Sequence, residues 1–238
     1  STRPLTTLQK QALEESIGSG YKIIWVEGWA QKWRMAKLLF QNAKIRLTIP
    51  EAYEVHKRII EWDSQYSEDR IPDQALGVDP VTLKLMRWAM QSWSRIQVMN
   101  RYFAGTLMPR MQLDMMPALR CAAHFIIISK KPLESIDHYL EGGRALQRFW
   151  LTSTSLGLQF QPEMTPLIFS RYQAESEQFT GDARAIRSAE SLASQLKLFV
   201  AETGIRNAVF MGRLGSGRVP ASRSVRRSIS KLSTTIRQ

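Results

Sequence analysis

The pattern of apolar and polar positions is clearest over residues 122–166, where it predicts a strand, a long helix, a second strand and a loop. The run 124–128 is β-branched and aromatic, is too short for a helix, and is followed by Lys-Lys-Pro. A helix is expected from about Ser135 to Gly157, because glycine favours the left-handed conformation at a helix end. Its buried stripe is predicted from residues that recur every three or four positions: Ile136, Leu140, Gly143, Leu146, Trp150 and Ser153. A strand over 158–161 then leads into a proline-bracketed loop, 162–166, at the sheet edge, where we expect a ligand to be held.

The rest of the chain shows mostly helical periodicity. Helices are predicted over 8–17, with Thr6 or Thr7 as the cap, and over 28–42, 50–62, 81–102 and 183–202. Strands are predicted over 21–26 and 208–212, and a short helix or loop over 172–179. The polar segment 64–80 is predicted to be a loop that serves as a lid or a linker. The fold class that follows is α+β, with helices packed around a small, mostly antiparallel sheet in a single domain over 1–238.

Three groups of residues permit a structural and a functional interpretation. Trp25, Trp29 and Trp33 either form a stacking platform or pack in the core or a dimer face, and their apolar neighbours favour packing. The Met-rich stretch 103–116 is predicted to be irregular, and it either fills the core or lines an adaptable apolar pocket. Cys121 is the only cysteine, so it forms no internal disulfide, and a buried structural thiol is favoured over a nucleophile.

The positive charge is concentrated at one end of the chain. The net charge is +12, from 33 basic and 21 acidic residues. Seven of the basic residues and no acidic one lie in 213–238, which leaves 26 basic and 21 acidic residues, a net of +5, for the rest. This basic C-terminal segment is either a solvated tail or a place where an anionic group binds.

Several classes of site and location are not indicated by the sequence. No apolar stretch approaches the roughly 20 residues that cross a bilayer, so no membrane partner is expected. Glycine-rich residues occur at 212–217, but Arg218-Val219-Pro220 does not open a helix there, and a dinucleotide fingerprint is not expected. We find no Cys/His cluster and expect no metal. The polar N-terminus and single cysteine favour a cytoplasmic protein.

One set of motifs resembles a known family. The pattern G-x-A-x-Q-x-x-W-L at 143–151 is followed by S-x-G-L at 155–158, by Gln161-Pro162 and Thr165-Pro166, and later by Phe-Met-Gly-Arg-Leu-Gly at 210–215. Together these resemble the second half of a nitroreductase, in the divergent subgroup that occurs alone or fused to adenylating, ubiquitin-activating-like domains. The similarity extends from about Leu8 to the C-terminus. It implies flavin mononucleotide (FMN) as cofactor, NAD(P)H as co-substrate, an electron-poor small-molecule acceptor and a homodimer with flavin at the subunit interface.

The resemblance also implies a binding site. Arg223, Arg226 and Arg227, with Ser222 and Ser224, correspond to the segment that grips the flavin phosphate.

Pro162, Glu163 and Met164 correspond to the loop against the flavin ring, where the amide of Glu163 or Met164 would reach the ring nitrogen that accepts hydride. No side chain is expected to act as acid or base, because the cofactor carries the chemistry.

The first-half motifs of the family, Arg-Ser-x-Arg and Pro-Ser…Asn-x-Gln-Pro-Trp, are absent. The chain is therefore expected either to be the C-terminal part of a longer protein, with an N-terminal half or fused domain, or to have lost the usual flavin binding. Three functions remain open: an FMN-dependent oxidoreductase, a non-catalytic relic of the flavin fold that serves interaction or storage, and nucleic-acid binding through the basic C-terminus. The last is disfavoured because the remaining charge is nearly balanced.

Overall fold

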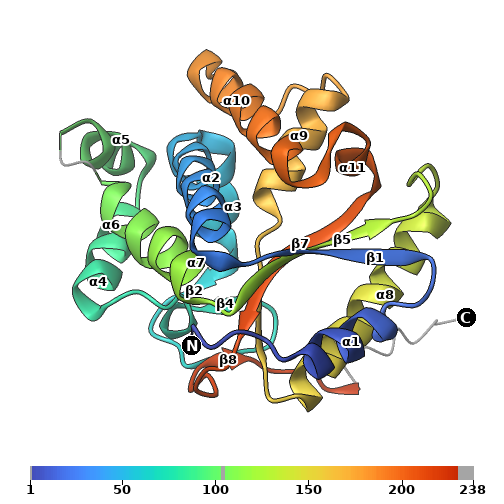
Figure 1. Ribbon diagram of the computed structural model, residues 1–238. Coiled ribbons are helices and arrows are strands. Elements are labelled where there is room, and N and C mark those ends of the chain that lie inside the picture. Colours follow the sequence, from blue (N-terminus) through green and yellow to red (C-terminus); the bar gives the residue numbers. More distant parts are fainter. Residues whose placement is uncertain (1, 103–104, 230–238) are drawn as a thin grey trace, which may run out of the picture.

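The computed structural model describes residues 2–102 and 105–229, and its centre is a four-stranded antiparallel sheet (Figure 1). The strands are β1 (Tyr21–Val26), β5 (Ala123–Ser129), β7 (Ala208–Gly215) and β6 (Gln159–Pro162), in the order β1-β5-β7-β6. Every residue of β5 is buried, because helices cover both faces of the sheet. β7 lies between β5 and β6, so the two strands that flank the long helix are not neighbours, and β6 forms the edge.

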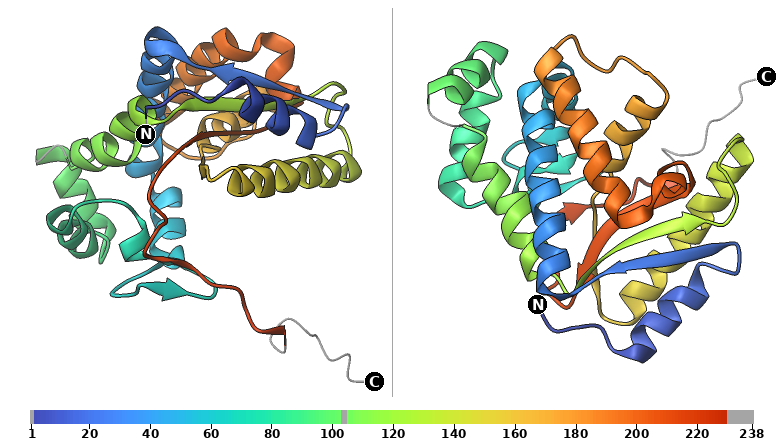
Figure 2. Two further views of the ribbon diagram at one scale, coloured as in Figure 1. Left: turned by 60° about the horizontal axis from the view of Figure 1, so that its bottom comes forward. Right: turned by 45° about the horizontal axis from the view of Figure 1, so that its top comes forward.

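Helices pack on both faces of this sheet (Figure 2). One face is covered by α2 (Gly28–Thr48), α7 (Met116–Arg120), α9 (Thr165–Ala174), α10 (Ala183–Val200) and α11 (Glu202–Asn207). The other face is covered by α1 (Thr7–Ser16) and α8 (Ile136–Ser155), over an aromatic core in which the rings of Phe125 and Phe149 lie 4.5 Å apart. The fold is therefore α+β, with a small antiparallel sheet between two helical layers.

A further group of elements lies beside the sheet, between α2 and α7 in sequence. It contains α3 (Pro50–Ile59), η1 (Asp73–Ala75), α4 (Pro80–Ala89), α5 (Trp93–Tyr102), α6 (Leu107–Arg110) and a π-helix, η2 (Met111–Met115). Two short parallel pairs join it: β2 (Ile60–Glu61) with β4 (Ile71–Pro72), and β3 (Tyr66–Ser67) with β8 (Arg223–Ser224). The predicted loop 64–80 thus holds short strands and a 3₁₀ turn.

Several predicted elements are confirmed. β1 has the predicted bounds, and α1 begins after Thr6, whose side chain accepts from the Gln9 amide in a capping box. Cys121 is buried, as expected for a structural thiol. The helix predicted over 81–102 is wrong in one respect, since it is two helices: α4 ends at Ala89 and Ser92 accepts from the Arg95 amide at the start of α5.

The predicted buried stripe of α8 is wrong for most of its residues, although Ser153 is buried and Leu146 is partly buried as predicted. The buried residues are Gly142, Ala145, Phe149 and Ser153, whereas Ile136, Leu140 and Trp150 are 78%, 58% and 42% exposed. Small residues allow the helix to approach the sheet, because a Cβ at Gly142 would lie 2.9 Å from Val209 Cγ1 on β7. Several large apolar side chains of α8 therefore face outward.

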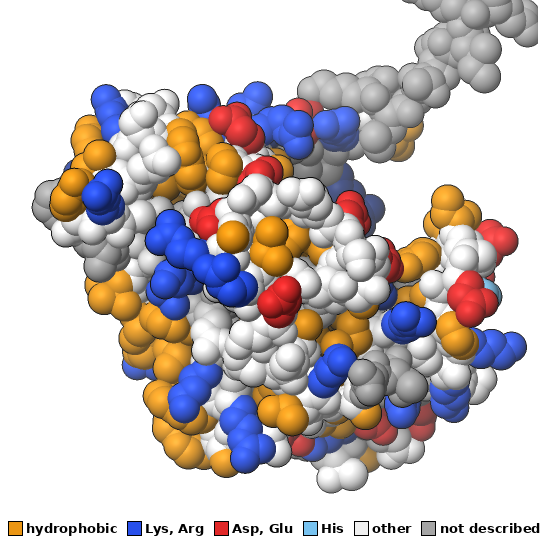
Figure 3. Space-filling model, turned by 90° about the horizontal axis from the view of Figure 1, so that it is seen from above, with side chains coloured by type: hydrophobic (Ala, Val, Ile, Leu, Met, Phe, Trp, Pro, Cys, Tyr) orange, Lys and Arg blue, Asp and Glu red, His pale blue; other side chains and the backbone are white. Residues whose placement is uncertain are grey.

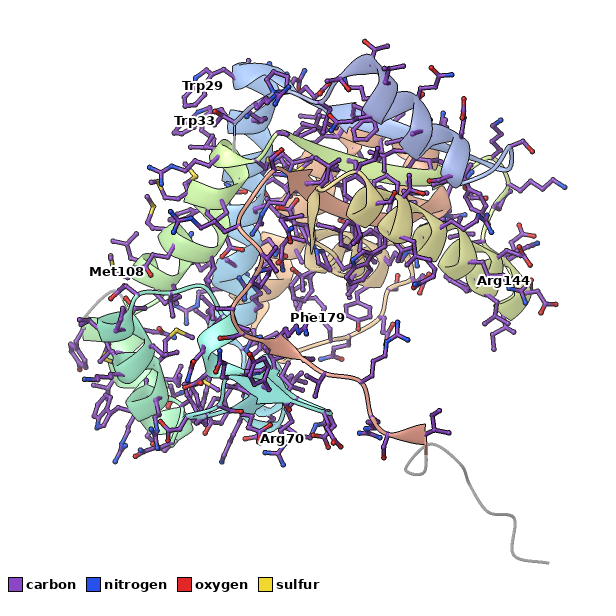
Figure 4. All side chains as sticks on the ribbon, turned by 90° about the horizontal axis from the view of Figure 1, so that it is seen from below. Trp29, Trp33, Arg70, Met108, Arg144 and Phe179 are labelled. Carbon is purple, nitrogen blue, oxygen red and sulfur yellow. The ribbon has the colours of Figure 1, made fainter. Side chains whose placement is uncertain are left out.

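The predicted loop 162–166 is shorter than expected, because α9 begins at Thr165 with Pro166 in its first turn. Core packing is likewise the wrong interpretation for Trp29, which is 68% exposed and stacks on Trp33 with 6.1 Å between ring centroids (Figure 4). Within the described residues, none of the helices combines the length and apolar character that crossing a membrane requires.

Candidate functional site

The turn between β6 and α9 lies over a group of buried charged side chains. Strand register brings this about: His124 on β5 is directly opposite Arg213 on β7, and Pro162 on β6 is opposite Gly212. A side chain at Gly212 would meet the Gln161 carbonyl at 2.7 Å, so glycine permits this close strand approach. Glu163 leaves β6 next to both His124 and Arg213, and its amide donates to the Met211 carbonyl at 2.9 Å.

Glu163 bridges two cations. One carboxylate oxygen, Oε2, lies 2.7 Å from Nδ1 of His124, and the other, Oε1, accepts from Arg213 Nη1 at 2.7 Å. The side chains of Glu163 and His124 are only 3% and 1% exposed. The second ring nitrogen of His124, Nε2, lies 3.0 Å from the Ala118 carbonyl oxygen. Both ring nitrogens therefore face acceptors, an arrangement that only the doubly protonated imidazolium satisfies.

The pKa values follow from this geometry. Burial has the largest single effect on the pKa of His124 and lowers it, but the contributions of Glu163 and Cys121 together exceed it and raise the pKa to about 10. Burial raises the pKa of Glu163, and His124 and Arg213 together bring it below its ordinary value. The trio is thus ionised at neutral pH, with two positive charges and one negative.

A second ion pair lies next to the trio. Arg46 on α2 donates from Nη2 to both carboxylate oxygens of Asp114 at 2.9 and 2.8 Å, and Asp114 belongs to the π-helix. Burial raises the pKa of Asp114, and the charge of Arg46 opposes that effect. We call His124, Glu163, Arg213, Arg46 and Asp114 the ion cluster. With both acids ionised it carries one net positive charge beneath the β6–α9 turn.

The two predicted halves of the flavin site lie apart within one chain. The chain after β7 leaves the sheet and pairs with β3, so Arg223 and Ser224 lie beside Tyr66 and Ser67 (Figure 2). Ser224 Oγ donates to the Arg70 carbonyl at 2.9 Å, and Arg70 marks this region in Figure 4.

The other members of the predicted phosphate segment differ in exposure and pairing. Ser222 is buried, and Arg227 pairs with Asp69 at 3.5 Å. Arg223 and Arg226 are exposed and have no carboxylate partner within the described part of the chain. The last nine residues of the basic segment, 230–238, lie outside the described residues.

The loop predicted to lie against the flavin ring, residues 162–164, varies in exposure along its length. Pro162 is exposed, Glu163 is buried and Met164 is half-buried. Because the Glu163 amide is occupied by Met211, it is not available to a ligand, and that alternative for the ring donor is wrong. The Met164 amide has no acceptor among the described residues, so it is the remaining candidate.

Four members of the ion cluster were not anticipated as site residues: His124, Arg213, Arg46 and Asp114. His124 opens an otherwise apolar strand, which is a weak signal of a paired polar group, but its partner is 39 residues away. Within the described residues no group of three or more His, Cys, Asp or Glu side chains is arranged to hold a metal ion.

Comparison with protein-family models finds no match for this chain, and comparison with curated proteins finds none of significance.

Proposed function

We propose that this chain forms part of an FMN-dependent oxidoreductase that passes hydride from NAD(P)H, through the flavin, to a small electron-poor acceptor. The observation that carries the proposal is the β6–α9 turn, where the Met164 amide has no acceptor among the described residues and lies next to a buried cluster of net positive charge. FMN would supply the hydride-accepting ring, and reduction places negative charge on that ring. A fixed amide and a fixed positive charge favour such charge without reorganisation.

The chemistry of the donor set fits a phosphorylated cofactor. Arg223 and Arg226 are exposed and without a carboxylate partner among the described residues, and guanidinium groups suit the oxygens of a phosphate. Ser222 in the same segment is buried and the Ser224 hydroxyl already donates to the Arg70 carbonyl, so the arginines carry the proposed phosphate contact. Because the turn and this segment are apart within one chain, the proposal places the phosphate on the segment of a second copy.

The outer face of α8 supports a homodimer. Ile136, Leu140, Trp150 and Leu151 are 78%, 58%, 42% and 59% exposed and lie along one helix. Exposed apolar side chains of this size, with Arg144 and Gln147 among them, suit a surface that a partner covers. Charge offers less support for nucleic-acid binding, since Asp, Glu and apolar side chains lie among the groups of Lys and Arg on the face seen in Figure 3.

Flavin titration of the purified chain tests this proposal. We expect FMN fluorescence to be quenched on binding. The double substitution Arg223→Gln with Arg226→Gln should lower the affinity for FMN at least tenfold and leave the affinity for riboflavin, which lacks the phosphate, unchanged. Arg187→Gln, an exposed arginine on α10, is the matched control. Failure to bind FMN, or equal loss for riboflavin, contradicts the proposal.

Reduction of the bound flavin separates the oxidoreductase from a storage module. We expect anaerobic NADPH or NADH to bleach the flavin absorbance, and a quinone or nitroaromatic to restore it. A flavin that binds tightly but is not bleached by either nicotinamide supports storage and refutes the oxidoreductase.

A further inference from the structure

A cavity of about 330 Å³ lies between α4, α5 and α6, away from the β6–α9 turn. Four methionines contribute to its walls: Met86, Met90, Met99 and Met108. The volume is roughly twice the approximately 150 Å³ of an apolar cavity that holds benzene. It is also at the lower end of the range for small-molecule sites, about 300–1,000 Å³.

The walls are built by the local sequence. α4 and α5 are separated only by 90–92, so they return side by side and leave space between their inner faces. The end of α5 is tied back, because the Gly105 amide donates to the Met99 carbonyl at 2.9 Å. A Cβ at Gly105 would lie 2.8 Å from that of Met99, so glycine is required for this closure. Met108 lies at the surface beside this end (Figure 4) and is 55% exposed at the cavity's edge.

The cavity has one charged side chain, at its exposed rim. Among its described lining residues there is no Lys, Arg or His. Its single acid, Asp79, accepts from the Val81 and Thr82 amides, from the Thr82 hydroxyl and from Gln112. These bonds, led by the Thr82 hydroxyl, hold the pKa of Asp79 well below its usual range, so the carboxylate is already satisfied at the rim.

Two neutral polar groups remain. The amide oxygen of Asn100, whose nitrogen donates to the Leu47 carbonyl at 3.2 Å, has no further partner among the described residues. The Thr106 hydroxyl likewise has none in the described ranges, and both residues line the cavity. They suit a ligand with one weak donor or acceptor.

We propose that this cavity is a binding site for an uncharged, mainly apolar small molecule of about two fused aromatic rings or similar volume. Methionine side chains are flexible and polarizable, so they adapt to flat rings and short aliphatic chains alike. An anion would face the negative charge of Asp79. A cation would lose its hydration between the apolar walls, because Asp79 lies at the exposed rim with its oxygens already hydrogen-bonded, so charged analogues of either sign are rejected. The site is separate from the flavin proposal and does not depend on it.

The test uses the whole chain and the neutral dye N-phenyl-1-naphthylamine, whose fluorescence rises in apolar surroundings. Competitors share one ring system and differ in charge: 1-naphthalenemethanol, 1-naphthoate and 1-naphthylmethylammonium. We expect the neutral alcohol to displace the dye at least tenfold more effectively than either ion. No dye binding, or equal displacement by an ion, overturns the proposal.

Variants locate the dye. Ala89→Leu fills the cavity, and Met90→Gln makes its wall polar at similar volume. Each substitution should lower the affinity for the dye at least tenfold. Ala174→Leu and Met116→Gln make the same changes at exposed positions outside the cavity and should leave binding unchanged. Circular dichroism confirms that each variant is folded. The two cavity variants act differently, one by reducing the volume and one by adding polarity, so a single folded variant is enough for the test. Unaltered dye binding in a folded variant refutes the site.

Discussion

The substitution Glu163→Gln isolates the central charge of the ion cluster. It keeps the size of the side chain but removes the negative charge that lies 2.7 Å from both His124 and Arg213. Both His124 and Arg213 then lose their anionic partner in a site where the Glu163 side chain is only 3% exposed. Removing one partner of a buried pair costs about 3–5 kcal/mol. Because glutamine retains one acceptor oxygen, we expect the lower end, about 3 kcal/mol.

Urea denaturation followed by circular dichroism at pH 7 measures the free energy of unfolding directly. For a chain of this size, a loss of about 3 kcal/mol corresponds to a fall in Tm of roughly 6–12 °C. Glu141→Gln, which breaks an exposed ion pair with Arg144, is the control and should change stability by less than about 0.5 kcal/mol.

The pH dependence gives the same pair a second signature. The pKa of His124 is raised to about 10 in the folded chain. The stability that protonated His124 contributes is therefore fully present below about pH 6.5, the ordinary pKa of histidine, and is lost as the pH rises to about 10. The stability gap between the wild-type chain and Glu163→Gln should therefore narrow from pH 6.5 to pH 10.

A loss no larger than that of Glu141→Gln, or a gap that does not change with pH, refutes the assignment of an imidazolium to His124. A double-mutant cycle that combines Glu163→Gln with His124→Asn should show a coupling energy of about 1–3 kcal/mol. Loss of the carboxylate should cost less stability when residue 124 is a neutral asparagine than when it is a charged histidine.

Three further predictions follow from individual positions. His56 has its pKa lowered to about 4 by burial and a neighbouring arginine, so the wild-type chain should lose about 1–2 kcal/mol between pH 6.5 and 4.5. His56→Gln should remove most of that loss in thermal melts at the two pH values. Gly142→Ala should lower stability by about 1–3 kcal/mol because its Cβ has no room, whereas Gly143→Ala, with open space, should be neutral or stabilising in urea melts. Leu140→Glu on α8 should convert a dimer to a monomer in sedimentation velocity, whereas a chain that is monomeric before the change contradicts the dimer proposal.

The local elements could be predicted because their signals are short-range. Thr6 with Gln9 specifies a helix start, and the apolar run 124–128 specifies a buried strand, since each depends on neighbours within a few positions. The sequence predicts the proline-containing turn at a sheet edge, and β6, which precedes it, is the edge strand. Periodicity alone chose the wrong face of α8, because glycine and alanine pack against a sheet as closely as larger apolar residues do.

Only the tertiary structure decided the composition of the candidate site. The order β1-β5-β7-β6 inserts a strand from the end of the chain between two from the middle, and this alone brings His124, Glu163 and Arg213 together. Their separations of 39 and 50 residues exceed any helical or strand period, so no local pattern marks the trio. Electrostatic partners are chosen by strand register and burial, which depend on packing of the whole sheet, whereas caps and periodicity depend on backbone geometry that the sequence specifies locally.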